Sequence, residues 1–243
     1  MSALARLAGR VRKAVAGVPP GVRVLALLCI AAHAAQSVVA AAPVRTVLLG
    51  PDASAHVLVQ DPLAFLFAIH GIGLSLGFVW TPFSYVFLHA SWLHLAMNLA
   101  GLLVFGSAVE ATAGRRTMLG LFVASGLVGG LAWTFANGLA SAQPCMGASA
   151  AVLGLAGAHA ALRPRDGFVL YIPLPVPMPA WLLAAVLFLV NAAELRFVES
   201  NVAYLAHLAG IAAGLAAGLA LRLLRHRLHH RLDRSGADGR GVR

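Results

Sequence analysis

Acidic residues and cysteines are scarce in this 243-residue sequence. Eight Asp and Glu residues accompany eighteen Lys and Arg residues, and charged residues make up 11% of the chain. A soluble protein with so few charges and 60% hydrophobic residues would lack a surface to present to water. The two cysteines, Cys29 and Cys145, provide neither a disulfide framework nor the spacing of a metal site. The composition predicts an all-α polytopic membrane protein.

The net charge of +10 would suit a nucleic-acid partner, but the positions of the basic residues fit membrane topology better. If the basic N-terminus lies inside, sixteen Lys and Arg residues fall on the inner side, and only Arg45 and Arg196 fall outside. Short inner loops of membrane proteins carry such an excess. We therefore expect no nucleic-acid partner, and we expect both termini in the cytoplasm.

Apolar segments predict six transmembrane helices, at about 22–42, 92–112, 117–138, 149–162, 180–195 and 202–222. The expected organisation is a basic cytoplasmic segment over 1–21, a membrane domain over 22–224 and a basic cytoplasmic tail over 225–243. The first segment, with its basic flank and its Ala40-Ala41-Ala42 end, also resembles a secretory signal.

Residues 43–88 have little charge but are interrupted by prolines and glycines. They predict a long, partly buried outer loop with short amphipathic helices, whose aromatic residues suit a membrane interface. A single broken transmembrane helix at 63–80 is the alternative. On the inner side, the alternating prolines of 173–179 cannot form a helix and predict a stiff, extended connection.

A glycine turn at Gly147 places Ser149 at the start of an apolar helix that ends before Arg163. Fourteen steps rise roughly 21 Å, against a hydrocarbon core of about 30 Å. The helix is too short to cross, so Ser149 is expected about 10 Å below one surface. Irregular backbone at that depth must be covered by protein or line a water-filled cavity.

Polar side chains from three predicted helices share this depth. Counted from the inner boundary charges, Asn98, Ser149 and His207 have heights of ~25, ~21 and ~22 Å. His94 lies one helical turn from Asn98 on the same face. Polar groups in a membrane interior are functional candidates. Two others, Glu110 and His159, are interpreted as residues of the inner interface.

Glycines predict how two of these helices pack. Gly210, Gly214 and Gly218 recur every fourth residue after His207, and a helix containing Gly154 and Gly157 is thin enough to enter the resulting groove. This pairing would bring Ser149 and His207 together at one height. A histidine that removes the proton of a serine hydroxyl makes the serine a nucleophile.

No Asp or Glu lies in this layer, so a Ser149–His207 dyad is favoured over a triad. The Asn98 amide, the His94 ring and backbone N–H groups at Ala148 and Ser149 could stabilise an oxyanion. Three alternatives remain open at this point: a structural serine that hydrogen-bonds between helices, a histidine that relays protons or ions, and a transporter or channel. Cys145 is interpreted as a packing residue, with a reactive thiol as the alternative.

Three motifs resemble the rhomboid intramembrane serine proteases, over about residues 78–220. His94-Leu95-Ala96-Met97-Asn98 is similar to the HxxxN element of that family, and Gly147-Ala148-Ser149-Ala150 to its GxSx turn. Ala206-His207-Leu208-Ala209-Gly210 with Gly214 is similar to its AHxxGxxxG helix. Each motif is weak alone, but their order and common depth make the resemblance specific.

The resemblance implies a rhomboid-like six-helix bundle with a short central serine-bearing helix. It implies Ser149 as nucleophile, His207 as base, and His94 and Asn98 as oxyanion partners, with helix packing at Gly147, Gly154, Gly210 and Gly214. The expected partners are single-span membrane protein substrates, cleaved near the outer face, and the lipid bilayer. No cofactor or metal is expected, and the expected location is a bacterial inner (plasma) membrane.

Two departures from the family pattern concern the site. Ala150 replaces a glycine that commonly follows the serine, and Leu153 replaces an aromatic residue on which the catalytic histidine usually rests. The competing class is a non-catalytic rhomboid-like protein that binds transmembrane clients. Such proteins are expected to lack the serine or the histidine, and both are present here.

Overall fold

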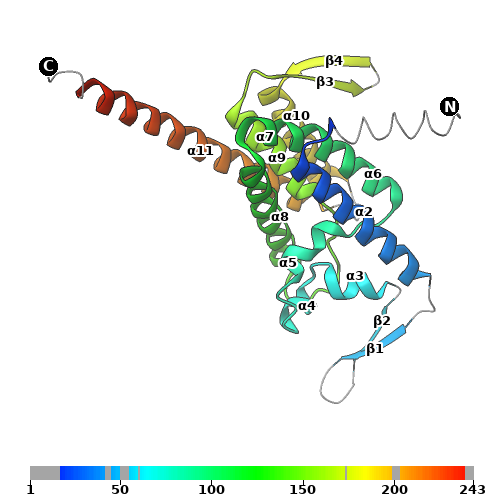
Figure 1. Ribbon diagram of the computed structural model, residues 1–243. Coiled ribbons are helices and arrows are strands. Elements are labelled where there is room, and N and C mark those ends of the chain that lie inside the picture. The colour runs from blue at the N-terminus through cyan, green and yellow to red at the C-terminus, as the bar shows by residue number, and fades with distance from the viewer. Residues whose placement is uncertain are drawn as a thin grey trace, which may run out of the picture.

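The structure, a computed structural model, describes residues 17–41, 45–49, 55–59, 61–172, 174–198 and 203–238. Among these residues, five helical segments are long and apolar enough to cross a membrane: α2 (Pro20–Ala40), the continuous α6, η2 and α7 (Trp92–Ala113), α8 (Arg115–Asn137), α10 (Ala180–Phe197) and the first part of α11 (Tyr204–Leu228). The apolar helix α9 (Ser149–Leu162) has 14 residues. The helical, polytopic membrane architecture is confirmed (Figure 1). The count of six membrane helices stays a prediction, since α9 is too short to cross.

Helix α2 begins where Pro20 occupies the first turn, a position at which a missing N–H costs nothing. Its next two backbone N–H groups, at Gly21 and Val22, donate to the two carboxylate oxygens of Glu110, each at 3.0 Å. These groups have no partner within their own helix, and negative charge is favoured at a helix N-terminus. Glu110 on α7 (Ser107–Ala113) therefore caps a helix from the beginning of the chain.

The second span is not uniformly α-helical. It consists of α6 (Trp92–Gly101), the π-helical η2 (Leu102–Gly106) and α7. Gly101 lies against α9, where a Cβ atom would approach Val152 Cγ1 to 2.7 Å. The segment therefore adjusts its winding at the level where it contacts the central helix.

Helix α9 is the centre of the bundle, and eleven of its fourteen residues are buried. It contacts α8, α10, α11 and η2. Its packing against α11 has no room for side chains, because a Cβ added at Gly210 would overlap the Ala150 carbonyl and one at Gly214 would overlap the Gly154 carbonyl. Gly218 continues this contact one turn further along, against Ala158.

The segment between the first two spans contains several short elements. Helices α3 (Pro62–Phe67), α4 (Gly71–Ser75) and α5 (Thr81–Ser84) are followed by the 3-10 turn η1 (Tyr85–Phe87), as expected for short helices in a long loop. The alternative of one broken transmembrane helix at 63–80 is wrong. The sequence did not predict the antiparallel hairpin of β1 (Arg45–Leu49) and β2 (Ala55–Val59).

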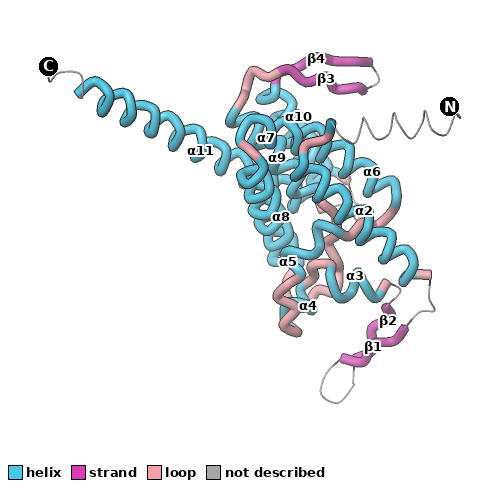
Figure 2. The backbone as a smooth tube through the Cα atoms, viewed as in Figure 1, coloured by secondary structure: helices cyan, strands magenta, loops and turns pink. Residues whose placement is uncertain are grey.

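A second antiparallel hairpin lies at the opposite end of the bundle (Figure 2). It pairs β3 (Gly167–Ile172) with β4 (Leu174–Pro179), so the proline-rich segment is extended, as predicted, but is also paired. Alternate residues of a strand direct their backbone N–H groups to the same edge. The prolines of β4 occupy alternate positions whose N–H groups would face away from β3, so the lack of an N–H does not disturb the pairing. Helix α11 continues to Asp238 and projects beyond the other helices (Figure 1), so the expected boundary at 224 is not a break in the helix.

Candidate functional site

Ser149 is the first residue of α9, and the turn before it is held on both sides. Cys145 pairs with Ile69 through two backbone hydrogen bonds of 2.8 and 3.1 Å, and the Gly147 N–H donates to the Tyr85 carbonyl at 3.0 Å. Gly147 has a φ of +125°, which an L side chain rarely adopts. Cys145 and Ala148 are buried, whereas Ser149 is only half-buried. The residues of the turn are therefore shielded by surrounding protein, while Ser149 itself stays partly exposed.

His207 lies on α11 directly beside this serine. Its Nε2 atom is 2.7 Å from Ser149 Oγ, within hydrogen-bond distance. The approach follows from the glycine contact between α9 and α11, because Gly210 lies one turn after His207 and touches the backbone of Ala150. The structure thus brings together the two side chains that sequence reasoning placed at one depth.

The other nitrogen of His207 has a partner that sequence reasoning missed. Nδ1 is 2.7 Å from Oδ1 of Asn191, a buried residue of α10. The Asn191 amide also donates from Nδ2 to the Leu187 carbonyl at 2.8 Å. Asn191 lies eleven residues after the start of α10, at a height of roughly 17 Å, so the depth count applied to other helices would have flagged it.

His94 and Asn98 lie beside the serine turn, on α6. The Asn98 side chain is buried and donates from Nδ2 to the His94 carbonyl at 2.9 Å. The His94 ring rests on Gly147, where a Cβ atom would come within 2.6 Å of Cε1. Within the described residues, no hydrogen bond joins either side chain to Ser149. Their role as oxyanion partners, like that of the Ala148 and Ser149 backbone, stays a prediction.

Comparison with known proteins adds the family. The rhomboid domain pattern matches residues 76–224, more than half of the chain. This chain belongs to the rhomboid family. It is 30% identical over 171 residues to "Rhomboid protein 1, mitochondrial" of Saccharomyces cerevisiae, covering 67% of this chain and 49% of that protein. It is 31% identical over 134 residues to "RHOMBOID-like protein 12, mitochondrial" of Arabidopsis thaliana, covering 49% of this chain and 39% of that protein.

This rhomboid therefore spans about half, or less, of the length of these relatives. Both relatives are mitochondrial by name, so they give no support to the expected bacterial inner membrane. The family and the apolar helices make the chain an integral membrane protein.

A second group of polar side chains lies behind His94 in this rhomboid. The His94 ring meets the edge of the His89 ring, with centroids 5.2 Å apart, and His89 in turn meets His33 of α2 at 6.2 Å. Gln36 accepts the His89 backbone N–H at 3.2 Å and donates to Asp61 at 2.5 Å. His33 and Gln36 belong to the first predicted span, whereas Asp61 and His89 belong to or directly follow the predicted outer loop. Nothing in the sequence indicated that these two segments are in contact.

Burial changes the acid-base chemistry of groups outside the spans. It lowers the pKa of His89 to about 4, with the neighbouring His94 adding to the effect. It raises the pKa of Cys145 to about 12, so that thiol is protonated at neutral pH and is unsuited to nucleophilic attack. Among the described residues, no group of three or more His, Cys, Asp or Glu side chains is arranged to hold a metal ion.

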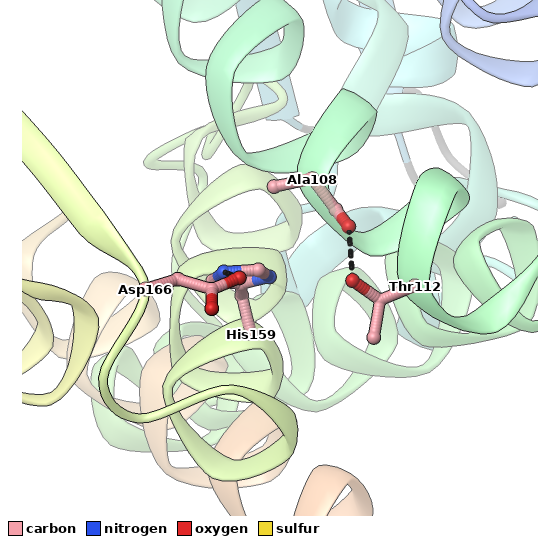
Figure 3. A network of polar contacts seen from close by, with 4 residues as sticks. All are labelled: Ala108, Thr112, His159 and Asp166. Carbon is pink, nitrogen blue, oxygen red and sulfur yellow. Dashed lines mark hydrogen bonds and ion pairs between the residues drawn. The ribbon is translucent and has the colours of Figure 1, made fainter.

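The position of His159 at the inner interface stays a prediction, and the structure adds its partner, Asp166. Figure 3 shows His159, near the end of α9, facing Asp166 beside α7, where Thr112 donates to the Ala108 carbonyl at 2.8 Å. His159 Nε2 lies 3.2 Å from an Asp166 carboxylate oxygen, and the Phe168 ring meets the imidazole edge-on at 5.3 Å. Asp166 begins the approach to the β3–β4 hairpin, so this pair joins α9 to that hairpin, away from Ser149.

Proposed function

We propose that this rhomboid protein is an intramembrane serine endopeptidase that cleaves single-span membrane proteins. The observation that carries the proposal is the 2.7 Å separation between His207 Nε2 and Ser149 Oγ at the head of a buried, short helix. A serine hydroxyl is a poor nucleophile until a base accepts its proton. A neutral imidazole at this distance meets that requirement.

In the proposed reaction, Ser149 Oγ attacks the scissile carbonyl carbon while His207 Nε2 takes the hydroxyl proton. The tetrahedral intermediate collapses, the carbon–nitrogen bond breaks, and His207 returns the proton to the leaving amine. A water molecule, deprotonated by the same imidazole, then attacks the acyl carbon, the bond from that carbon to Ser149 Oγ breaks, and His207 returns the proton to Oγ. His94, Asn98 and backbone N–H groups at Ala148 and Ser149 are the proposed donors to the oxyanion. These steps need no cofactor.

The proposed substrates are transmembrane segments that unwind beside α9, near the membrane face toward which Ser149 lies. The proposed topology keeps both termini on the arginine-rich cytoplasmic side. The retained serine and histidine favour this function over a non-catalytic client-binding rhomboid. A transporter is disfavoured because the polar layer is confined to one part of the membrane thickness rather than forming a path across it.

The test is cleavage of a panel of single-span substrates by the purified protein in proteoliposomes. Ser149→Ala and His207→Ala should each abolish cleavage, and the double variant should be hardly worse, since the two residues act as a unit. Ser37→Ala is the matched control, because that membrane-helix hydroxyl donates to the His33 carbonyl at 2.8 Å on its own helix. Cleavage by Ser149→Ala at the parental rate would refute the proposal.

A further inference from the structure

We propose that Asn191 is a positioning residue that holds His207 in the tautomer needed to activate Ser149. This inference rests on the proposed serine-protease function. Asn191 is 7% exposed on α10, a helix whose other residues near it are mostly apolar. A buried amide in a membrane helix is costly unless its polar atoms have partners. Both kinds of polar atom in this amide have one.

The orientation of the amide follows from its contact with its own helix. The Leu187 carbonyl can only accept a hydrogen bond, so the group 2.8 Å from it must be the Asn191 NH₂. A flipped amide would set two acceptor oxygens against each other at that position. The amide oxygen is therefore the atom that faces His207 Nδ1.

That orientation determines which nitrogen of His207 carries the proton. The Asn191 oxygen accepts at 2.7 Å, so Nδ1 must be the donor, and a neutral imidazole then has its lone pair on Nε2. Nε2 is the atom 2.7 Å from Ser149 Oγ. A chain of hydrogen bonds thus runs from the Leu187 carbonyl, through Asn191 and His207, to the serine.

The hydrogen bond between Asn191 and His207 also bears on Leu153, the position at which rhomboid proteases usually have an aromatic residue under the histidine. An aliphatic side chain there, half-buried in the structure, cannot restrain an imidazole by ring stacking. His207 is instead restrained by Asn191 at one nitrogen, by Ser149 at the other, and by the ring of Tyr204, which meets it edge-on at 6.2 Å. An amide supplies this orientation without placing a full negative charge in the membrane interior.

The first experiment measures cleavage kinetics of a single-span substrate in proteoliposomes, together with thermal stability. Asn191→Leu should lower kcat by roughly 10- to 100-fold, as expected for a misplaced catalytic group, and leave KM within about threefold. It should still fold, because one interhelical hydrogen bond contributes little to membrane-protein stability. Asn191→Asp as the neutral acid keeps both contacts, with its O–H donating to the Leu187 carbonyl and its C=O accepting from His207 Nδ1, so it should recover much of the rate.

Asn137→Leu is the control, since Asn137 on α8 makes the same amide contact, to Trp133 one turn back at 2.9 Å, and among the described residues has no hydrogen bond to Ser149 or His207. It should keep parental kcat. The inference is overturned if Asn191→Leu retains parental kcat, or if its loss only follows a loss of folded protein that Asn191→Asp shares.

The second experiment does not depend on activity. Nitrogen-15 NMR of histidine-labelled protein, with the His207 signals identified by their loss in His207→Gln, should show the Nδ1–H tautomer in the parent and a mixture in Asn191→Leu. An Nε2–H tautomer in the parent would overturn the role of Asn191. An Nδ1–H parent that cleaves no substrate would instead refute the protease function and leave the positioning contact in place.

Discussion

A buried neutral imidazole lies at the entrance to the second membrane span. His89 is 1% exposed, and its Nδ1 atom is 3.2 Å from the Phe87 carbonyl, so Nδ1 carries the proton and donates. Its Nε2 atom is buried without a hydrogen-bond partner among the described residues. If Nε2 were protonated, its N–H would find no hydrogen-bond acceptor and the charged ring would be buried away from water. Burial therefore lowers the pKa of His89 to about 4.

His89 should therefore make folding stability depend on pH. Its pKa is lower in the fold than the ordinary value near 6.5, so the unfolded chain binds more protons between about pH 4 and 6.5. The contribution to stability is present above pH 6.5 and is lost as the pH falls through this window, at no more than about 1.4 kcal/mol per pH unit.

The measurement is the thermal midpoint of the parent and of His89→Asn from pH 4.5 to 7.5. Asn can donate to the Phe87 carbonyl but never becomes charged, so the variant should lose less stability on acidification. Histidines away from His89 contribute equally to both curves, and the two that touch it, His33 and His94, when protonated repel a charged His89 but not an uncharged Asn, which adds to the difference. Parallel curves for the two proteins would show that His89 is not the group responsible.

At the scale of helices, close backbone contact between α9 and α11 positions the candidate site. Glycine in a helix costs about 1 kcal/mol relative to alanine in soluble proteins, so its repeated use requires a packing reason. The reason is visible at Gly210, Gly214 and Gly218, where carbonyl groups of α9 occupy the space a side chain would need. Gly154 is crowded on two sides, by Ser125 of α8 and by the Gly210 carbonyl.

Gly214→Ala should separate α9 from α11, since its Cβ would overlap the Gly154 carbonyl oxygen. Overpacking of this kind costs roughly 1–3 kcal/mol, and the Ser149–His207 distance should lengthen. We expect a lower thermal midpoint together with reduced cleavage.

Gly120→Ala provides the control for this change, because it lies within α8 with no atom within 4 Å of an added Cβ. It should leave both properties near parental values. Equal effects of the two substitutions would contradict a specific α9–α11 contact.

The two ends of the bundle differ in composition. The end carrying α3, α4 and α5 is rich in aromatic residues, and the opposite end carries the β3–β4 hairpin with Arg163 and Arg165 before it (Figure 1). The basic part of α11 extends from this second end, with Arg222 reaching the Ala161 carbonyl at 3.3 Å. The positive-inside rule predicts that the hairpin end faces the cytoplasm.

Labelling with a membrane-impermeant thiol reagent tests this topology. Ser75→Cys, an exposed position on α4, should react in intact cells, whereas Gly167→Cys, an exposed position at the start of β3, should react only after permeabilisation. The native Cys29 and Cys145 are both buried and should give little background. Reaction of Gly167→Cys in sealed cells would reverse the predicted orientation.

Local sequence patterns were sufficient for the approximate positions of the apolar helices and for the serine turn. Hydrophobic length, boundary arginines and glycine spacing are properties of contiguous segments, and together they predicted the spans, the short helix after Ser149 and the common depth of Ser149 and His207. Depth can be counted along one helix because the rise per residue is constant.

Which side chains face one another depends on how the helices pack in three dimensions. The rotation of α10 about its axis places Asn191 against His207, and the same kind of long-range placement brings Glu110 to the N-terminus of α2, 89 residues before it in the chain. The two hairpins and the His33–His89–His94 contacts also join segments that carry no mutual signal. The physical reason is that helix rotation depends on packing against every neighbour at once, whereas hydropathy in a membrane varies little around a helix that is apolar on all sides.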